Sequence, residues 1–141
     1  MVSEANRYQL AYLVAALSRR LELEIEERLR PEGVAIEPFR VLGFLAENDG
    51  QPMGELAVRV LVDSPTLTKT IDRMVANALV YRAPDPTDRR RVLIFLSEKG
   101  RRLQKRLAAL VAAPGSDLAE GLRDPDAAAL QSLLTRLVPA S

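Results

Sequence analysis

The sequence of 141 residues contains no cysteine and no histidine. Without cysteine, the chain can form neither a disulfide nor a thiolate zinc site, and it has no cysteine nucleophile. Without histidine, it has no imidazole base, no imidazole metal ligand and no Ser-His-Asp relay. Catalysis would have to rest on carboxylates, Lys, Tyr or Ser. We therefore predict no catalytic residues, no metal site and no cofactor, and expect binding to be the activity.

Long apolar runs are also missing. No stretch approaches the roughly 20 apolar residues that a membrane span needs, and the first residues lack the charged-then-apolar order of a signal peptide. We therefore expect no membrane partner and a cytoplasmic location.

The chain has almost no net charge, since 20 Lys and Arg oppose 19 Asp and Glu. A total of +1 argues against nucleic-acid binding, but the charges are unevenly distributed along the chain. Residues 64–106 contain eleven basic and four acidic residues, whereas the rest contains nine basic and fifteen acidic ones. A basic segment of this kind is typical of a surface that meets a polyanion. A solvated helix face explains the basic group at residues 101–106 equally well.

The first third of the chain predicts one long helix. Apolar residues recur there at steps of three and four, and Pro31 and Gly33 end the pattern. A stripe of this length predicts burial against another long helix, in this chain or in a second copy. Its residues are Leu10, Leu13, Val14, Leu17, Leu21, Ile25 and Leu29.

Three short helices and two strands are predicted next. The first helix is opened by Pro38. The second covers about Met53 to Leu61, and the third begins at Asp63-Ser64-Pro65. Two strands, residues 80–83 and 91–96, flank a loop rich in Pro and Asp. A helix-turn-helix followed by a hairpin predicts a mainly α winged helix-turn-helix with a small β-wing. Further helices follow Ser97-Glu98 and Asp124-Pro125, separated by a break at Pro114-Gly115.

The helix that begins near Ser64 presents small polar and basic residues opposite its apolar side. Hydroxyls and amides near a helix N-terminus can bind phosphate oxygens, and Lys or Arg can reach phosphates or guanine edges. The competing interpretation is that these residues only cap and solubilise the helix. The candidate DNA-binding residues are Ser64, Thr66, Thr68, Lys69 and Arg73.

The loop between the strands carries the most specific motif. The sequence from Asp88-Arg89-Arg90 to Leu96-Ser97 resembles the D-x-R-x-x-x-x-x-L-[S/T] wing signature of the multiple-antibiotic-resistance regulator (MarR) family. Residues 66–74 resemble that family's helix-turn-helix, and residues 79–82 resemble the entry to its wing. The resemblance extends over essentially the whole chain, and the terminal helices match in length and pattern.

The resemblance implies a winged-helix transcriptional regulator, typically a repressor, that binds a pseudo-palindromic operator in double-stranded DNA as a homodimer. Residues 1–35 and 98–141 would form the dimerisation helices, and residues 36–97 the DNA-binding domain. Arg90 matches the arginine that enters the minor groove, with Arg89 and Arg91 beside it. Asp88 matches the acidic residue that holds either this arginine or an arginine of the recognition helix in place.

A small aromatic or phenolic effector is a further implication of the resemblance. Candidate pocket residues are Tyr12, Phe39 and Arg40, although core packing and surface exposure account for them better. Three positions depart from the family pattern. Pro65 stands where small polar residues are common, and Leu61 and Ala78 stand where glycine is frequent.

Two other functions remain open at this point. The carboxylates Glu22, Glu24, Glu26 and Glu27 could be read as part of an enzyme site, but a solvated helix surface explains them better. The winged helix could also serve protein contacts without binding DNA. A salt-dependent mobility shift on promoter fragments separates that module from a DNA-binding regulator.

Overall fold

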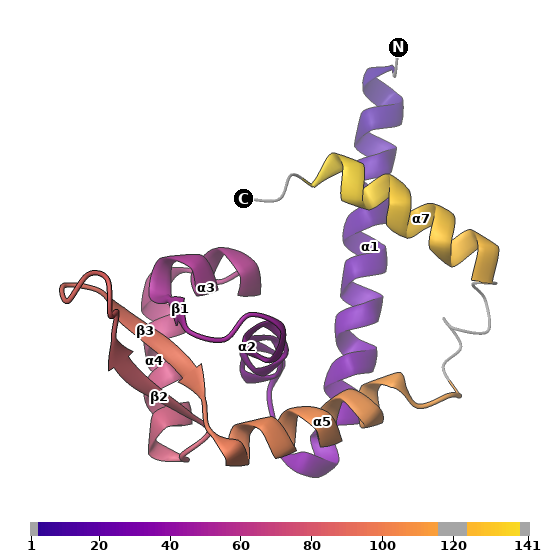
Figure 1. Cartoon of the computed structure of the whole chain (residues 1–141). Coiled ribbons are helices and arrows are strands. Elements are labelled where there is room, and N and C mark those ends of the chain that lie inside the picture. Colours follow the sequence, from indigo (N-terminus) through magenta and orange to yellow (C-terminus); the bar gives the residue numbers. More distant parts are fainter. Residues whose placement is uncertain (1–2, 116–123, 139–141) are drawn as a thin grey trace. The chain divides into compact units, whose positions relative to one another are not determined.

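The computed structural model describes residues 3–115 and 124–138, which form two compact units (Figure 1). The helical unit contains α1 (Glu4–Leu29) as far as Glu27, together with α7 (Asp124–Leu137). The winged unit is Arg28–Ala112. Residues 116–123 and 139–141 of the segment that we expected to form C-terminal dimerisation helices lie outside the described residues.

The winged unit is built on four helices that surround one apolar core. They are α2 (Ile36–Glu47), α3 (Met53–Val60), α4 (Ser64–Ala76) and α5 (Glu98–Ala112), and a short 3₁₀ turn, η1 (Arg30–Glu32), precedes them. In each helix one face supplies the core, as the three- and four-residue spacing of apolar residues predicts. The fully buried core residues include Leu42, Leu45, Leu56, Ile71, Ile94 and Leu107.

The wing is a small antiparallel sheet in the strand order β1-β3-β2. Strands β2 (Val80–Pro84) and β3 (Val92–Leu96) form the predicted hairpin, with Val80 opposite Leu96 and Pro84 opposite Val92. The third strand, β1 (Gln51–Pro52), was not predicted. Its two residues are too few to show any alternation of apolar and polar side chains.

The predicted fold class, a mainly α winged helix-turn-helix with a small β-wing, is confirmed. One helix start was misplaced, because α2 begins at Ile36 rather than at Pro38. Pro38 lies in the first turn, where a missing N–H costs no intrahelical bond. None of the described helices combines the length and the apolar character that crossing a membrane requires.

Two turns of the winged unit hold non-glycine residues in the left-handed region. Leu61, which ends α3, has φ 61°, and Ala78, which follows α4, has φ 59°. These are two of the positions at which glycine was expected from the family pattern. The helix-turn-helix therefore keeps its geometry here at the cost of some backbone strain.

The helical unit leaves its apolar side chains uncovered. None of its described residues is buried, although α1 and α7 share an apolar groove of about 290 Å³. All of the buried apolar residues belong to the winged unit. The groove is lined by Leu10, Leu13, Val14, Leu17, Ser18, Leu21, Leu130 and Leu134.

Candidate nucleic-acid interface

The outer face of α4 is polar and accessible. Its inner face buries Leu67, Ile71 and Met74, and this burial turns the opposite side of the helix to solvent. All five candidate residues on α4 are exposed, so they can meet a ligand that approaches this face. They are Ser64, Thr66, Thr68, Lys69 and Arg73.

Asp63 caps the N-terminus of α4, as its position before Ser64-Pro65 predicts. Its Oδ1 accepts a hydrogen bond of 2.8 Å from the Thr66 amide. The backbone and side-chain hydrogen bonds of Thr66 lower the pKa of Asp63, and nearby Lys69 lowers it further. Because this amide is already bonded, it is not a free donor for a phosphate.

The Thr68 hydroxyl is also engaged within the helix. Its Oγ1 donates to the carbonyl oxygen of Ser64 at 3.0 Å, which is a common arrangement for threonine in helices. Because Thr68 is exposed, its hydroxyl oxygen can still accept a hydrogen bond but has no further proton to donate. The basic candidates Lys69 and Arg73 therefore provide most of the attraction that α4 offers to an anion.

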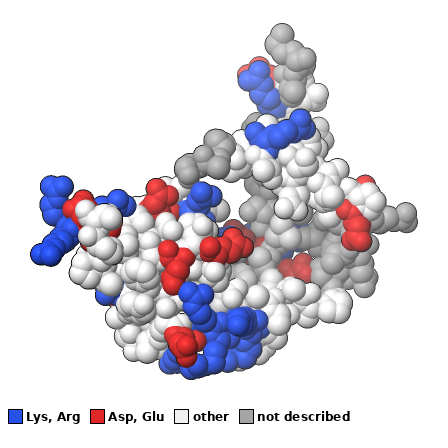
Figure 2. Space-filling model, viewed as in Figure 1, with Lys and Arg blue, Asp and Glu red and all other residues white. Residues whose placement is uncertain are grey.

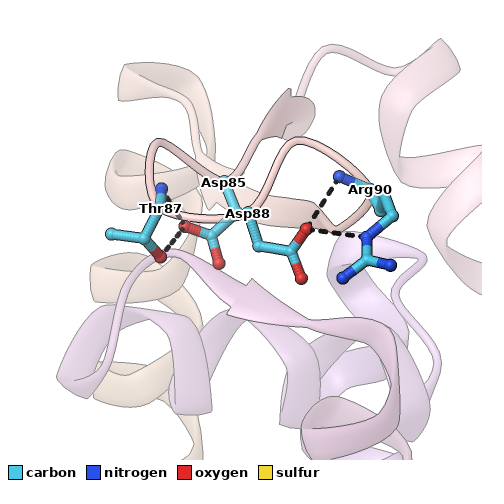
Figure 3. A network of polar contacts seen from close by, with 4 residues as sticks. All are labelled: Asp85, Thr87, Asp88 and Arg90. Atoms are coloured by element: carbon cyan, nitrogen blue, oxygen red, sulfur yellow. Dashed lines mark hydrogen bonds and ion pairs between the residues drawn. The ribbon is translucent and has the colours of Figure 1, made fainter.

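The wing loop is held by two aspartates (Figure 3). Asp85 Oδ1 accepts from the amide and the hydroxyl of Thr87 at 2.9 and 2.8 Å, and these bonds lower the pKa of Asp85. Asp88 Oδ1 accepts from the backbone N and the Nε of Arg90 at 3.1 and 3.3 Å. The loop thus has a defined conformation at its tip.

Arg90 is oriented while remaining accessible. Its side chain is 92% exposed, and the contact with Asp88 uses Nε. The two terminal nitrogens can therefore still donate to acceptors outside the chain. Arg89 and Arg91 are exposed as well, and Figure 2 shows basic side chains gathered around the end of this loop.

Two carboxylates that sequence reasoning did not select connect the wing to the helices. Arg82 Nη2 of β2 donates to Asp72 Oδ1 of α4. Asp49 accepts from the Leu96 amide at 2.9 Å through Oδ1 and from Arg101 Nη2 at 2.8 Å through Oδ2. The partners are distant in sequence, so no local pattern could have found them.

Ser97 ends the wing signature and joins the wing to α5. Its hydroxyl lies 2.6 Å from the Ala78 carbonyl oxygen and 3.0 Å from that of Leu79, and it accepts from the Gly100 amide at 2.9 Å. The small hydroxyl residue at this point of the signature therefore caps α5 and secures the turn after α4.

The basic group on α5 is largely used inside the winged unit. Arg101 pairs with Asp49, Arg106 with Glu32 at 3.2 Å, and Arg102 with Glu98 at 3.7 Å. Ion pairs between elements support the solvated-surface interpretation for this group. The basic candidates of α4 and the wing are exposed and remain the candidates for binding a polyanion.

The candidate effector residues lie on two different units of the chain. Tyr12 lies exposed on α1 in the helical unit, while Phe39 and Arg40 lie partly buried on α2 in the winged unit. Among residues 3–115 and 124–138, no group of three or more His, Cys, Asp and Glu could hold a metal ion. The α1 carboxylates Glu22, Glu24, Glu26 and Glu27 therefore form no such group.

Comparison with known proteins identifies the family. The family model described as "MarR family" matches residues 32–91. The HTH-type transcriptional regulator YsmB of Bacillus subtilis is 33% identical over 105 residues, which cover 73% of this chain and 72% of YsmB. The chain belongs to the MarR family. Another relative, the HTH-type transcriptional regulator TtmR of Methylorubrum extorquens, is 33% identical over 102 residues, 72% of this chain. The chain spans 52% of TtmR's length.

Solved MarR-family structures share this fold. A mutant of MarR from E. coli in complex with operator DNA is 28% identical and has a TM-score of 0.79, with coverage of 93% of this chain and 94% of that one. CouR from Rhodococcus jostii bound to p-coumaroyl-CoA is 26% identical and has a TM-score of 0.82, with 99% coverage of both chains. These similarities agree with the family assignment made from the wing and the helix-turn-helix.

Proposed function

We propose that this chain is a sequence-specific DNA-binding regulator of transcription that represses a pseudo-palindromic operator as a homodimer. The observation that carries the proposal is the combination of two basic elements in one compact unit. The exposed face of α4 presents Lys69 and Arg73, and the wing presents an exposed Arg90 held by Asp88. The relative of known structure in complex with operator DNA supports the same conclusion.

The chemistry of each element suits a different part of the duplex. An α-helix fits the major groove, where Lys69 and Arg73 can bind guanine edges or phosphates. An arginine held out on a thin loop fits the minor groove, whose negative potential is strongest where it is narrow. Ser64, Thr66 and Thr68 on α4, and Arg89 and Arg91 on the wing, would bind the phosphates on either side.

The helical unit supplies the reason for a dimer. An apolar face this long, left unburied by the described residues, is typical of a surface that associates. A second copy provides the same stripe, and a two-fold pair would match the symmetry of a palindromic site. In this proposal residues 1–35 and 98–141 form the dimer contacts, and residues 36–97 bind the DNA.

An effector is the natural means of release. The relative bound to p-coumaroyl-CoA supports a small aromatic ligand for this chain too, with Tyr12, Phe39 and Arg40 as the candidate residues. An effector that binds one arrangement of the dimer more tightly than another would shift the dimer toward that arrangement. The resulting change in DNA affinity is limited by the ratio of the effector's affinities for the two arrangements. Since a regulator of transcription acts where the DNA is, we place the protein in the cytoplasm, and we assign it no catalytic step.

The proposal is tested by DNA binding measured at several salt concentrations. The chain should bind duplex from beside its own gene, and log affinity should fall linearly with log salt. Arg90→Ala should weaken specific binding by about 1–3 kcal/mol with the fold intact, as expected for an arginine contact. Arg102→Ala, on α5, is the matched control and should change little. A module that serves only protein contacts would show no salt-dependent shift at all.

A further inference from the structure

One ion pair joins the recognition helix to the wing. Asp72 lies on the exposed side of α4, and Arg82 lies in the middle of β2. In the antiparallel register Arg82 is opposite Ile94, whose side chain is fully buried. Arg82 therefore occupies the sheet face that is turned toward α4, and its guanidinium reaches Asp72 from there.

The position of Asp72 is unfavourable for binding DNA by charge alone. It lies three residues after Lys69, a spacing at which helix side chains are neighbours, and it directly precedes Arg73; all three residues are exposed. A carboxylate on a surface that meets phosphates repels them. A residue of this charge at this place needs a compensating role.

Fold stability does not provide that role. The side chains of Arg82 and Asp72 are 38% and 58% exposed. Exposed ion pairs of this kind contribute little to the free energy of folding, because water and salt screen them. The helix-turn-helix has a closed apolar core that does not depend on the pair.

What the pair does control is the placement of the wing relative to α4. Two residues after Arg82, β2 ends at Pro84 and the wing loop begins. That loop is internally fixed, since the Asp85 amide donates to the Arg91 carbonyl at 2.9 Å and the Arg91 amide donates to the Asp88 carbonyl at 3.0 Å. A defined loop on a strand anchored to α4 gives Arg90 a defined position relative to Lys69 and Arg73.

We propose that Asp72 and Arg82 are a positioning pair that sets the wing against the recognition helix, so that both engage one DNA half-site together. The pair acts through Arg90, Lys69 and Arg73 and does not need to touch DNA itself. Holding two reading elements in register before binding reduces the ordering cost of the complex. This inference rests on the proposed DNA-binding function.

Asp72→Asn separates positioning from plain electrostatics, because the two predict opposite signs. Removal of a negative charge beside DNA should tighten binding if charge is all that matters. The positioning pair predicts binding that is about two- to fivefold weaker, the size expected for an exposed ion pair. Glu98→Gln removes the same charge from α5 and should not weaken binding. Fluorescence anisotropy with a labelled duplex measures both variants, and thermal unfolding checks their folds.

A double-mutant cycle with Arg90→Ala then tests whether the pair acts through the wing. With the wing contact removed, Asp72→Asn should change affinity by less than about 1.5-fold, because there is nothing left to place. Arg82→Lys keeps the positive charge and can still donate to Asp72, so it should stay within about twofold of the unchanged chain. An equal loss in both backgrounds, or tighter binding by Asp72→Asn, would overturn the inference. If Arg90→Ala and Lys69→Ala are also without effect, the proposed function itself fails.

Discussion

The two compact units of this chain differ in how they dispose of their apolar side chains. The winged unit, Arg28–Ala112, buries an apolar core of its own. Its basic and small polar candidate residues lie on the surface. The described part of the helical unit buries none of its residues and exposes leucines along an apolar groove. We relate this contrast to the proposed function, in which the winged unit binds a polyanion and the helical unit binds an apolar protein surface.

The largest expected effect concerns the helical unit. Leu17→Glu places a charge in the groove that α1 and α7 share. Two leucines are lost per dimer, each worth about 1.5–3 kcal/mol when buried, so the dissociation constant should rise at least about 100-fold. Mass measurement by light scattering at micromolar concentration reads this directly. Arg19→Glu lies on the same helix outside the groove and should leave the mass unchanged.

The second-largest expected effect is a loss of folding stability in the winged unit. A Cβ at Gly100 would lie 2.1 Å from the Leu79 carbonyl oxygen, so that the turn after α4 or the start of α5 must shift. Gly100→Ala should lower the free energy of unfolding by about 2–3 kcal/mol. Gly54→Ala on α3, where a Cβ meets nothing within 4 Å, is the control. Equal urea midpoints for the two variants would show that the junction tolerates what the geometry excludes.

Relief of backbone strain should have a smaller effect in the opposite direction. Ala78 is held at φ 59°, which a glycine adopts without cost. Ala78→Gly should raise the free energy of unfolding by about 0.5–1 kcal/mol once the entropy of the unfolded glycine is included. Gly33→Ala, at φ 66° with open space around it, makes the reverse change and should destabilise the chain. If both variants shift the melting temperature in the same direction, strain is not the cause.

The smallest expected effect is on the pH dependence of folding stability, and it involves two aspartates of the proposed DNA-facing surface. The pKa values of Asp63 and Asp85 are lowered in the folded chain by hydrogen bonds from Thr66 and Thr87. A lowered folded pKa stabilises the protein above the unfolded value near 3.9, and this stability is lost as the pH falls through the folded pKa. Between pH 5 and pH 3, Asp63→Asn should therefore lose less stability than the unchanged chain. Urea unfolding at both pH values measures the difference.

The fold could be predicted wherever a residue pattern repeats or a residue type restricts the backbone. The three- and four-residue spacing of leucines predicts α1, and Asp63-Ser64-Pro65 predicts the start of α4. The two-residue strand β1 could not be predicted, because it has no period and exists only through pairing with β3. Helix periods and caps depend on neighbouring residues and can be predicted from them. The partner of a strand depends on residues far away in the sequence and cannot.

For the candidate site, too, residues that follow a local pattern could be predicted and long-range contacts could not. The surface residues of α4 and the wing could be selected from the sequence because they oppose an apolar stripe or match a motif. The contact of Asp72 with Arg82 and the bonds of Asp49 to Leu96 and Arg101 could not. Many carboxylates and arginines in the chain could have formed such pairs, and only the packing of the elements decides which ones meet.

The most direct measurement is the composition of the complex between this chain and DNA. A duplex selected by the protein from a random pool is mixed with it, and the mass of the complex is determined by native mass spectrometry. We expect two chains on one duplex whose selected sequence has two-fold symmetry, since in the proposed function the helical units pair and each winged unit binds one half-site. A single chain bound to a sequence without symmetry, or no selected sequence at all, would contradict it.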